Sequence, residues 1–208
     1  MIRNIVFDMG HVLMYFLPKV YVERLHVPEE DREPVLREVF RSVEWIRLDR
    51  GNITEEEAAA AMSARLPERL GETVRELVSG WWKGPLIPVE GMEALVAELK
   101  SMGYGIYLLS NAGKRLPEYF DRIPGAQYFD GRIVSAEWGV LKPQPEIYRI
   151  LLETYHLEAE ECFFIDDQLT NVEGACFVGL SGMVFDGDIG RLRQKLREAG
   201  VMVREDGC

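Results

Sequence analysis

Carboxylates at two places in the chain have the types and spacing of a divalent-cation site. Asp8 follows the apolar run IVF and precedes Gly10, while Asp166 and Asp167 are adjacent in IDDQLTNVEGA, with Asn171 at the start of a predicted helix. Magnesium takes oxygen ligands and is usually held by one or two carboxylates together with a substrate phosphate. Asp8 and Asp166 are predicted to share the ion, since neighbouring side chains on a strand diverge. The alternative is that the acidic pair and Asn171 only cap the helix.

Polar residues in two other segments are candidates for binding a phosphoryl group. Ser110 and Asn111, in LLSNAG, would bring a hydroxyl and an amide to the end of a buried strand. Lys142, in GVLKPQPEIY, precedes a predicted helix, and its ammonium would offset the carboxylates and bind phosphoryl oxygens. Each feature alone is typical of an ordinary turn or a solvated lysine, so the prediction depends on a fold that brings them together.

Short apolar runs alternate with helical patterns over most of the chain. Buried strands are predicted at residues 2–7, 106–109, 131–135, 162–165 and 183–185, and helices at 92–102, 144–155, 171–178 and 189–199. This alternation predicts an α/β fold with a doubly wound, mostly parallel sheet of the Rossmann-like kind. Ligands of such sheets bind beyond the carboxyl ends of the strands, which is where Asp8, Ser110 and Asp166 are expected.

Residues 14–88 break the alternation, because they contain several helical patterns and no convincing strand. Helices are predicted at 28–42, 55–65 and 69–81, the second opened by a capping box of Thr54 and Glu57. The segment is therefore predicted to be a helical cap insertion in a core domain formed by residues 1–13 and 89–208. Six of its side chains are candidates for facing the site or for packing in its core: Tyr15, Phe16, Tyr21, Trp45, Arg47 and Arg50.

Composition excludes some classes of partner. The formal net charge is −11 and the pI is near 4.9, which argues against a protein that wraps nucleic acid or coats an anionic membrane. No apolar run approaches the ~20 residues needed to span a bilayer, and the N-terminal residues lack the pattern of a signal peptide. The expectation is a cytoplasmic protein that acts on a small molecule.

Four ordered motifs resemble those of the haloacid dehalogenase-like superfamily: FDMGHVL at 7–13, LLSN at 108–111, GVLKPQPEIY at 139–148 and FFIDDQLTNVEGA at 163–175. The resemblance covers nearly the whole chain. It is greatest for the subgroup with a small helical cap, notably bacterial sugar-phosphate phosphatases of the α-glucose-1-phosphatase type, which also begin with an Asp-x-Gly pattern. The segment RGNITEEEAAAAM within the insertion adds to that likeness.

The resemblance implies a magnesium-dependent phosphatase that hydrolyses a small phosphate monoester, such as a sugar phosphate, through an aspartyl-phosphate. Asp8 would be the nucleophile, with Ser110 or Asn111 and Lys142 holding the phosphoryl group. Mg²⁺ would be the cofactor, bound by Asp8, the carbonyl of Gly10 and Asp166. Asp167 and Asn171 would support these groups without touching the ion.

One position departs from the family pattern. Most phosphatases of the superfamily carry a second aspartate two residues after the nucleophile, as general acid and then general base, but this chain has Gly10 there. Loss of positioned acid-base catalysis raises a barrier by roughly 3–5 kcal/mol unless another group substitutes. His11 is a candidate substitute, because an imidazole titrates near neutral pH. A structural or solvent-facing role for His11 is favoured over catalysis, since neighbouring side chains often point apart.

Two other functions stay open at this point. Dehalogenases of the same superfamily also lack the second aspartate and use the first to displace halide without a metal. The acidic pair Asp166 and Asp167 favours the phosphatase, since carboxylates crowded near Asp8 without a cation would repel one another. The departure at Gly10 also allows a binding or regulatory protein that has lost turnover.

Overall fold

Five short strands form one parallel sheet in the computed structural model, which describes residues 1–204. The strands are β1 (Asn4–Phe7), β4 (Gly105–Ser110), β5 (Gly131–Val134), β6 (Cys162–Asp166) and β7 (Ser181–Val184), and they lie side by side in the order β5-β4-β1-β6-β7. Every neighbouring pair is parallel. The predicted doubly wound α/β fold is confirmed.

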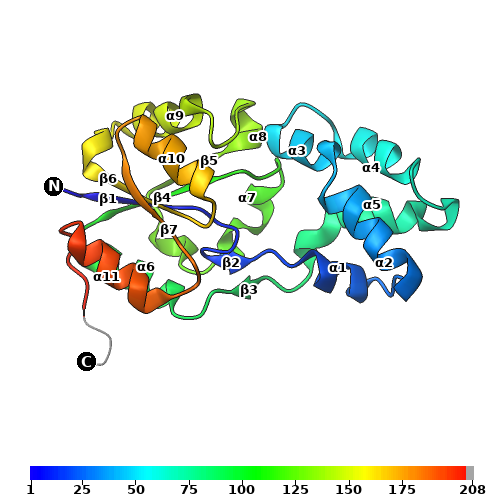
Figure 1. Ribbon diagram of the computed structural model, residues 1–208, viewed down its shortest axis with the longest axis horizontal. Helices are drawn as coiled ribbons and strands as arrows, with labels where there is room; N and C mark the ends of the chain where they lie inside the picture. The colour runs from blue at the N-terminus through cyan, green and yellow to red at the C-terminus, as the bar shows by residue number, and fades with distance from the viewer. Residues whose placement is uncertain (205–208) are drawn as a thin grey trace.

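Helices cover both faces of this sheet (Figure 1). They are α6 (Met92–Ser101), α7 (Leu116–Tyr119), α8 (Ser135–Trp138), α9 (Pro145–Tyr155), α10 (Leu169–Phe177) and α11 (Ile189–Glu198). Successive residues of each strand enter different cores: Ile5 and Phe7 pack in the cluster with α6 and α11, and Val6 packs in the cluster with α9 and α10. Because both faces are covered, the strands are continuous apolar runs.

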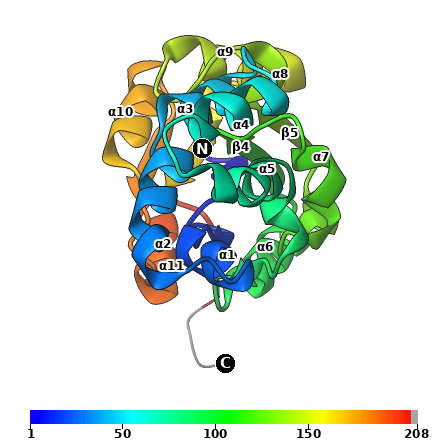
Figure 2. The same cartoon turned by 90° about the vertical axis from the view of Figure 1, so that its right-hand side faces the viewer.

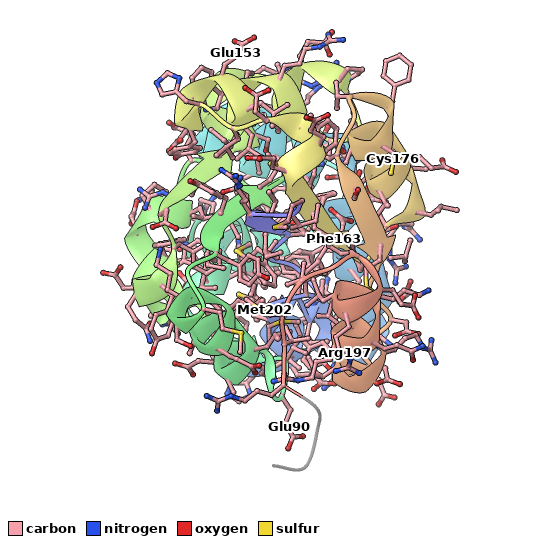
Figure 3. All side chains as sticks on the ribbon, turned by 90° about the vertical axis from the view of Figure 1, so that its left-hand side faces the viewer. Glu90, Glu153, Phe163, Cys176, Arg197 and Met202 are labelled. Carbon is pink, nitrogen blue, oxygen red and sulfur yellow. The ribbon has the colours of Figure 1, made fainter. Side chains whose placement is uncertain are left out.

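The side view of the core agrees with this layering. In Figure 3, Phe163 of β6 lies in the middle of the molecule, with Glu153 of α9 at the top and Arg197 of α11 below Phe163. Phe163 belongs to the buried cluster on the α6 and α11 side, with 4% of its surface exposed. The sheet is thus buried between two helical layers, and only the ends of its strands are open to a ligand.

Residues 16–86, which we call the helical insertion, lie beside the carboxyl ends of the strands (Figures 1 and 2). The insertion contains α1 (Pro18–Arg24), α2 (Glu29–Val35), a π-helical segment (Leu36–Phe40), α3 (Val43–Arg50), α4 (Glu55–Ser63) and α5 (Gly71–Gly80). Its helices pack around a buried cluster of their own that includes Val39, Met62 and Leu77. The predicted capping box of Thr54 and Glu57 opens α4.

The structure corrects the prediction that residues 14–88 contain no strand. Met14–Tyr15 (β2) and Ile87–Pro88 (β3) form an antiparallel pair where the chain enters and leaves the insertion. Two residues are too few to give the alternation by which a strand is recognised in a sequence. The division into 1–13 with 89–208 and 14–88 stays a prediction, and residues 205–208 lie outside the described part of the chain.

The helical predictions differ from the structure in detail. The helix predicted at 28–42 is divided into α2 and the π-helical segment, and the short helices α1 and α3 were not predicted. Ser135, predicted as the end of a strand, begins α8. Among the described residues, no helix is both long and apolar enough to cross a membrane.

Candidate active site

Two aspartates and a lysine meet at the carboxyl ends of β1 and β6. Asp8 directly follows β1, Asp166 is the last residue of β6, and Lys142 lies in the loop before α9. The ammonium Nζ of Lys142 lies 2.7 Å from Oδ1 of Asp8 and 2.7 Å from Oδ2 of Asp166. The structure therefore brings together the three charged groups on which the predicted site depends.

Lys142 is buried and its backbone is held by Asn111. Only 4% of Lys142 is exposed. Its backbone N–H donates to Oδ1 of Asn111 at 2.8 Å, and Nδ2 of Asn111 donates to the carbonyl oxygen of Lys142 at 3.1 Å. Both ends of the Asn111 amide are thus occupied by the loop that carries Lys142, which fixes the ammonium beside the end of β4.

Asp166 is enclosed, and both of its oxygens already have partners. Its exposed fraction is 0%. Oδ1 accepts from the backbone N–H of Gln168 at 2.8 Å, Oδ2 accepts from Lys142, and Nδ2 of Asn171 lies 3.0 and 3.1 Å from the two oxygens. Such a saturated carboxylate is suited to holding Lys142 in place.

Asp167 and Ser110 are placed differently, because both line the cavity above Asp8. Asp167 is half-buried, and within residues 1–204 its carboxylate accepts a hydrogen bond only at Oδ2, from Nε2 of Gln168 at 2.7 Å. The Ser110 hydroxyl forms no hydrogen bond with any of residues 1–204, although the residue is almost completely buried. A carboxylate and a hydroxyl are therefore available to a ligand at this point.

The surroundings of the site affect the charge of Asp8, the candidate nucleophile, differently from the charge of Lys142. Burial raises the pKa of Asp8 to about 6; the charge of Lys142 opposes this rise and the charge of Asp166 adds to it. Burial disfavours the charge on Lys142, but Asp8 and Asp166 outweigh burial and raise the pKa of the lysine above its usual range. Lys142 is therefore a permanent cation, whereas Asp8 is an anion whose charge depends on its partners.

A cavity of about 730 Å³ opens above these groups, between the strand ends and the helical insertion. Its wall on the insertion side is largely aromatic, with Phe16, Phe40, Trp45 and Trp81 in a contiguous cluster. Phe16 and Trp45, two of the six candidates for facing the site, thus line the cavity, and they also pack against the core of the insertion. Asp8 and Lys142 thus lie at the base of the cavity, and an aromatic cluster forms part of its wall.

An ion pair connects the insertion to the core at the rim of this cavity. Arg115, in the loop after β4, donates from Nε and Nη2 to the two carboxylate oxygens of Glu55, each at 2.9 Å. Glu55 begins α4. This bidentate contact is the geometry in which an arginine and a carboxylate interact best.

Sequence reasoning did not identify Asp49, which lies in the same cavity wall. Asp49 is in the last turn of α3, and burial together with the charge of Asp8 raises the pKa of Asp49 well above its usual range. Nothing near Asp49 in the sequence marks it as functional. The only available signal was its helix neighbour Trp45, since residues four apart share a face of a helix.

Gly10 and His11, which follow Asp8 closely in the sequence, also line the cavity. His11 is exposed, with a backbone φ of 57°, and its ring contacts Tyr15 at a centroid distance of 6.2 Å. A Cβ atom built on Gly10 would meet no heavy atom within 4 Å. The space that an aspartate at position 10 would occupy is therefore not filled by another described side chain.

Comparison with known proteins identifies a family and relatives of this chain. The family model of the haloacid dehalogenase-like hydrolases matches residues 2–176. The sesquiterpene phosphatase of Aspergillus oryzae is 31% identical over 185 residues, covering 86% of this chain and 87% of the relative. The D-ribitol-5-phosphate phosphatase of Bacteroides thetaiotaomicron is 26% identical over 183 residues, covering 83% and 86%.

A solved structure has the same fold. It is that of a haloacid dehalogenase-family enzyme from Bacteroides thetaiotaomicron, an aspartate-to-alanine mutant in complex with magnesium and inorganic phosphate. The TM-score is 0.70 and the identity 22%, over 92% of this chain and 99% of the other. The extent of the family match and the identity to the Aspergillus enzyme lead to one conclusion: the chain is a hydrolase and belongs to the haloacid dehalogenase-like family.

Proposed function

We propose that this hydrolase is a magnesium-dependent phosphatase that cleaves a phosphate monoester through an aspartyl-phosphate on Asp8. The observation that carries the proposal is the Lys142 ammonium, 2.7 Å from both Asp8 and Asp166 at the base of an open cavity. An Oδ atom of Asp8 attacks phosphorus, the bond to the alcohol oxygen breaks, and water then cleaves the aspartyl-phosphate. Lys142 and the Ser110 hydroxyl bind the transferring phosphoryl oxygens.

The donor set at the base of the cavity fits a divalent cation. Asp8, Asp166 and Asp167 each offer a carboxylate oxygen, and these atoms lie within 4.8 Å of one another. Three carboxylates and one ammonium leave two negative charges, which a divalent cation balances. Bound Mg²⁺ would act as a Lewis acid on a phosphoryl oxygen and reduce repulsion between substrate and nucleophile.

We assign the ion to Asp8, the carbonyl of Gly10 and Asp167, and this assignment differs from the one predicted from the sequence. Asp166 was expected to be the ligand, but its oxygens are engaged by Lys142, Gln168 and Asn171. Asp167, expected only to support the site, is half-buried and lines the cavity. Asp166 and Asn171 then position Lys142 and the loop between β6 and α10.

Substitution of Asp167 tests this assignment. Asp167→Asn is expected to raise the magnesium concentration for half-maximal activity by at least about tenfold, because it removes a charged ligand. It should also abolish most of the rise in melting temperature that magnesium produces in the wild type. Asp121→Asn, which removes an exposed carboxylate that does not line the cavity, is the control. If Asp166→Asn raised the magnesium concentration for half-maximal activity and Asp167→Asn did not, the metal ligand would be Asp166 and not Asp167.

We propose that the alcohol part of the substrate is apolar. Phe16, Phe40, Trp45 and Trp81 form a contiguous aromatic part of the cavity wall, which offers area to hydrocarbon but few hydrogen-bond partners to sugar hydroxyls. The Aspergillus relative is named for a sesquiterpene substrate. Because the Bacteroides relative is named for D-ribitol 5-phosphate, a sugar phosphate is the second candidate substrate.

Comparison of kcat/KM for farnesyl phosphate, ribitol 5-phosphate and glucose 1-phosphate separates these substrate classes. We expect farnesyl phosphate to be preferred, and Trp45→Ala to raise its KM by about 10–100-fold, the effect of losing one large apolar contact. Inhibition by inorganic phosphate should not change, because phosphate does not reach the wall. Trp138→Ala, at an exposed tryptophan outside the cavity, is the matched control. Preference for a sugar phosphate, unaffected by Trp45→Ala, would contradict the proposal.

The choice between phosphatase and dehalogenase requires one assay in three conditions. An aryl phosphate with magnesium should release phosphate, and the same mixture with EDTA should not. Chloride release from 2-chloropropionate in EDTA would instead support the dehalogenase. Absence of both activities would favour a non-catalytic binding protein. The three clustered carboxylates favour phosphate release, because a metal-free site would leave their charges unbalanced.

A further inference from the structure

The proposed phosphatase reaction needs a group that moves protons, and position 10 does not supply it. The leaving alcohol oxygen must gain a proton, and the water that attacks the aspartyl-phosphate must lose one. Gly10 has no side chain, and the space beside it is open to the cavity. The acid and base must therefore be a residue other than Gly10 that lines the same cavity.

Among the described carboxylates of the cavity wall, Asp49 differs from the others in its surroundings. Glu55 is paired with Arg115, Glu56 is exposed, and Asp167 accepts from Gln168. The Asp49 carboxylate is half-buried and forms no hydrogen bond or ion pair with any of residues 1–204. A half-buried carboxylate that no protein group satisfies is suited to a partner that arrives with the substrate.

The backbone of Asp49 is fixed to the core. The hydroxyl of Ser135, at the start of α8, donates to the Asp49 carbonyl oxygen at 2.5 Å. Two residues later, Gly51 (φ 76°) packs so closely on Ala136 that a Cβ atom would collide with the Ala136 carbonyl. The last turn of α3 is thus held against the part of the molecule that carries Asp8, and the carboxylate is not free to drift with the insertion.

We propose that Asp49 is the general acid and general base of the reaction. As Asp8 bonds to phosphorus and the ester P–O bond breaks, the leaving oxygen takes the proton of the Asp49 carboxylic acid. The Asp49 carboxylate then accepts a proton from water as the water oxygen attacks phosphorus and the bond to Asp8 breaks. Inorganic phosphate is released, Asp8 is regenerated and Asp49 is again protonated, so the cycle balances.

Local electrostatics are compatible with this role. Burial and the charge of Asp8 hold the pKa of Asp49 well above the ordinary aspartate range, which keeps its proton available. The other titratable and charged groups that line the cavity are His11, Glu55, Glu56, Tyr119, Lys114, Arg115, Lys142 and Asp167. Of these, His11 is the competing candidate, because it is exposed at the same cavity and an imidazole can both donate and accept a proton.

Esters with good and poor leaving groups separate proton transfer from a structural role. In Asp49→Asn with an alkyl phosphate, we expect kcat to fall by about 10²–10⁴-fold, because the alkoxide must leave without a proton. With an aryl phosphate, the first turnover should stay within about tenfold of wild type, since a phenolate needs no proton to leave. Later turnovers should be slow, giving a burst of one phenolate per site and a phosphorylated enzyme that can be trapped.

Two further variants sharpen the test. Gly10→Asp in the Asp49→Asn background should restore alkyl phosphate turnover by at least about tenfold, because the space beside residue 10 is free. His11→Gln should not produce a burst. Glu137→Gln, which alters an exposed carboxylate of α8 outside the cavity, is the matched control and should behave as wild type.

The result expected if Asp49 does not transfer protons differs from the result expected if the protein is not a phosphatase. If wild type releases phosphate from both esters and Asp49→Asn loses activity equally on both without a burst, Asp49 has only a structural role. Wild-type rates in Asp49→Asn, or a burst in His11→Gln, also overturn the proposal. If the wild type hydrolyses neither ester, it is the phosphatase function itself that fails.

Discussion

Asp8→Asn is expected to lower the rate of phosphate release by at least about 10⁴-fold and to raise the free energy of unfolding of the magnesium-free protein. An amide cannot form the acyl phosphate, so the loss should be similar for aryl and alkyl esters. The same substitution removes a charge that folding disfavours. The amide oxygen of the substituted side chain can still accept a hydrogen bond from Lys142 Nζ, so packing is preserved.

The sign and size of the stability change follow from the pKa of Asp8, which rises from 3.8 to about 6 on folding. A raised carboxyl pKa means that the folded state holds the proton more tightly, so stability is lost as pH increases from about 4 to about 6. Each pKa unit corresponds to about 1.4 kcal/mol, so Asp8→Asn should gain about 3 kcal/mol at pH 8 and little at pH 3.5.

Urea unfolding in EDTA at these two pH values measures the gain. Asp121→Asn serves as the control for a general effect of removing an acidic charge. Retained turnover in Asp8→Asn would remove the nucleophile assignment, and a variant that is less stable than wild type at pH 8 would mean that Lys142 more than compensates the burial of Asp8.

Lys142→Met is expected to have the largest destabilising effect in the molecule. It leaves Asp8 and Asp166 buried beside each other without a cation, and an uncompensated buried charge costs about 3–5 kcal/mol. Turnover should fall by at least about 10²-fold, because the phosphoryl group loses its fixed positive partner. The loss of stability should be smaller at pH 5 than at pH 8, since the unpaired carboxylates can then be protonated.

Urea unfolding at both pH values and single-turnover assays measure these effects. Lys195→Met is the control, because Lys195 forms an exposed ion pair with Glu198, and such pairs contribute under about 1 kcal/mol. Equal stability of Lys142→Met and Lys195→Met would show that the buried ion pairs do not hold the site together.

Much of the core could be predicted from the sequence, because strands covered on both faces are continuous apolar runs that end at polar residues. The residues around Asp8, Ser110 and Asp166 were recognisable for that reason, and all three lie at one edge of the sheet. The pair β2 and β3 was missed because two residues carry no periodicity. Helix α3 was missed because it is short and its apolar pattern does not match its burial: Val43 and Ile46 are exposed, whereas Glu44 is buried.

The details of the site depend on contacts that no local pattern encodes. Asp166 was predicted as the metal ligand and Asp167 as a supporting residue. Our different assignment rests on tertiary contacts, because Lys142 and Asn171 already engage the oxygens of Asp166. The interaction of the Asn111 amide with the Lys142 backbone joins residues 31 positions apart. Asp49 reaches the site only because α3 packs against α8, which is a tertiary contact.

The pairing of β2 with β3 has a consequence for how the molecule can diversify. Because Met14–Tyr15 and Ile87–Pro88 lie side by side, the chain leaves the core and returns to it at the same place, and the residues between them form one inserted loop. The entropy of closing such a loop grows only with the logarithm of its length, so residues there can be added, removed or exchanged with little penalty to the sheet. Selection for a new alcohol group can therefore change residues of the insertion other than Asp49, while Asp8 and Lys142 in the core are inherited unchanged.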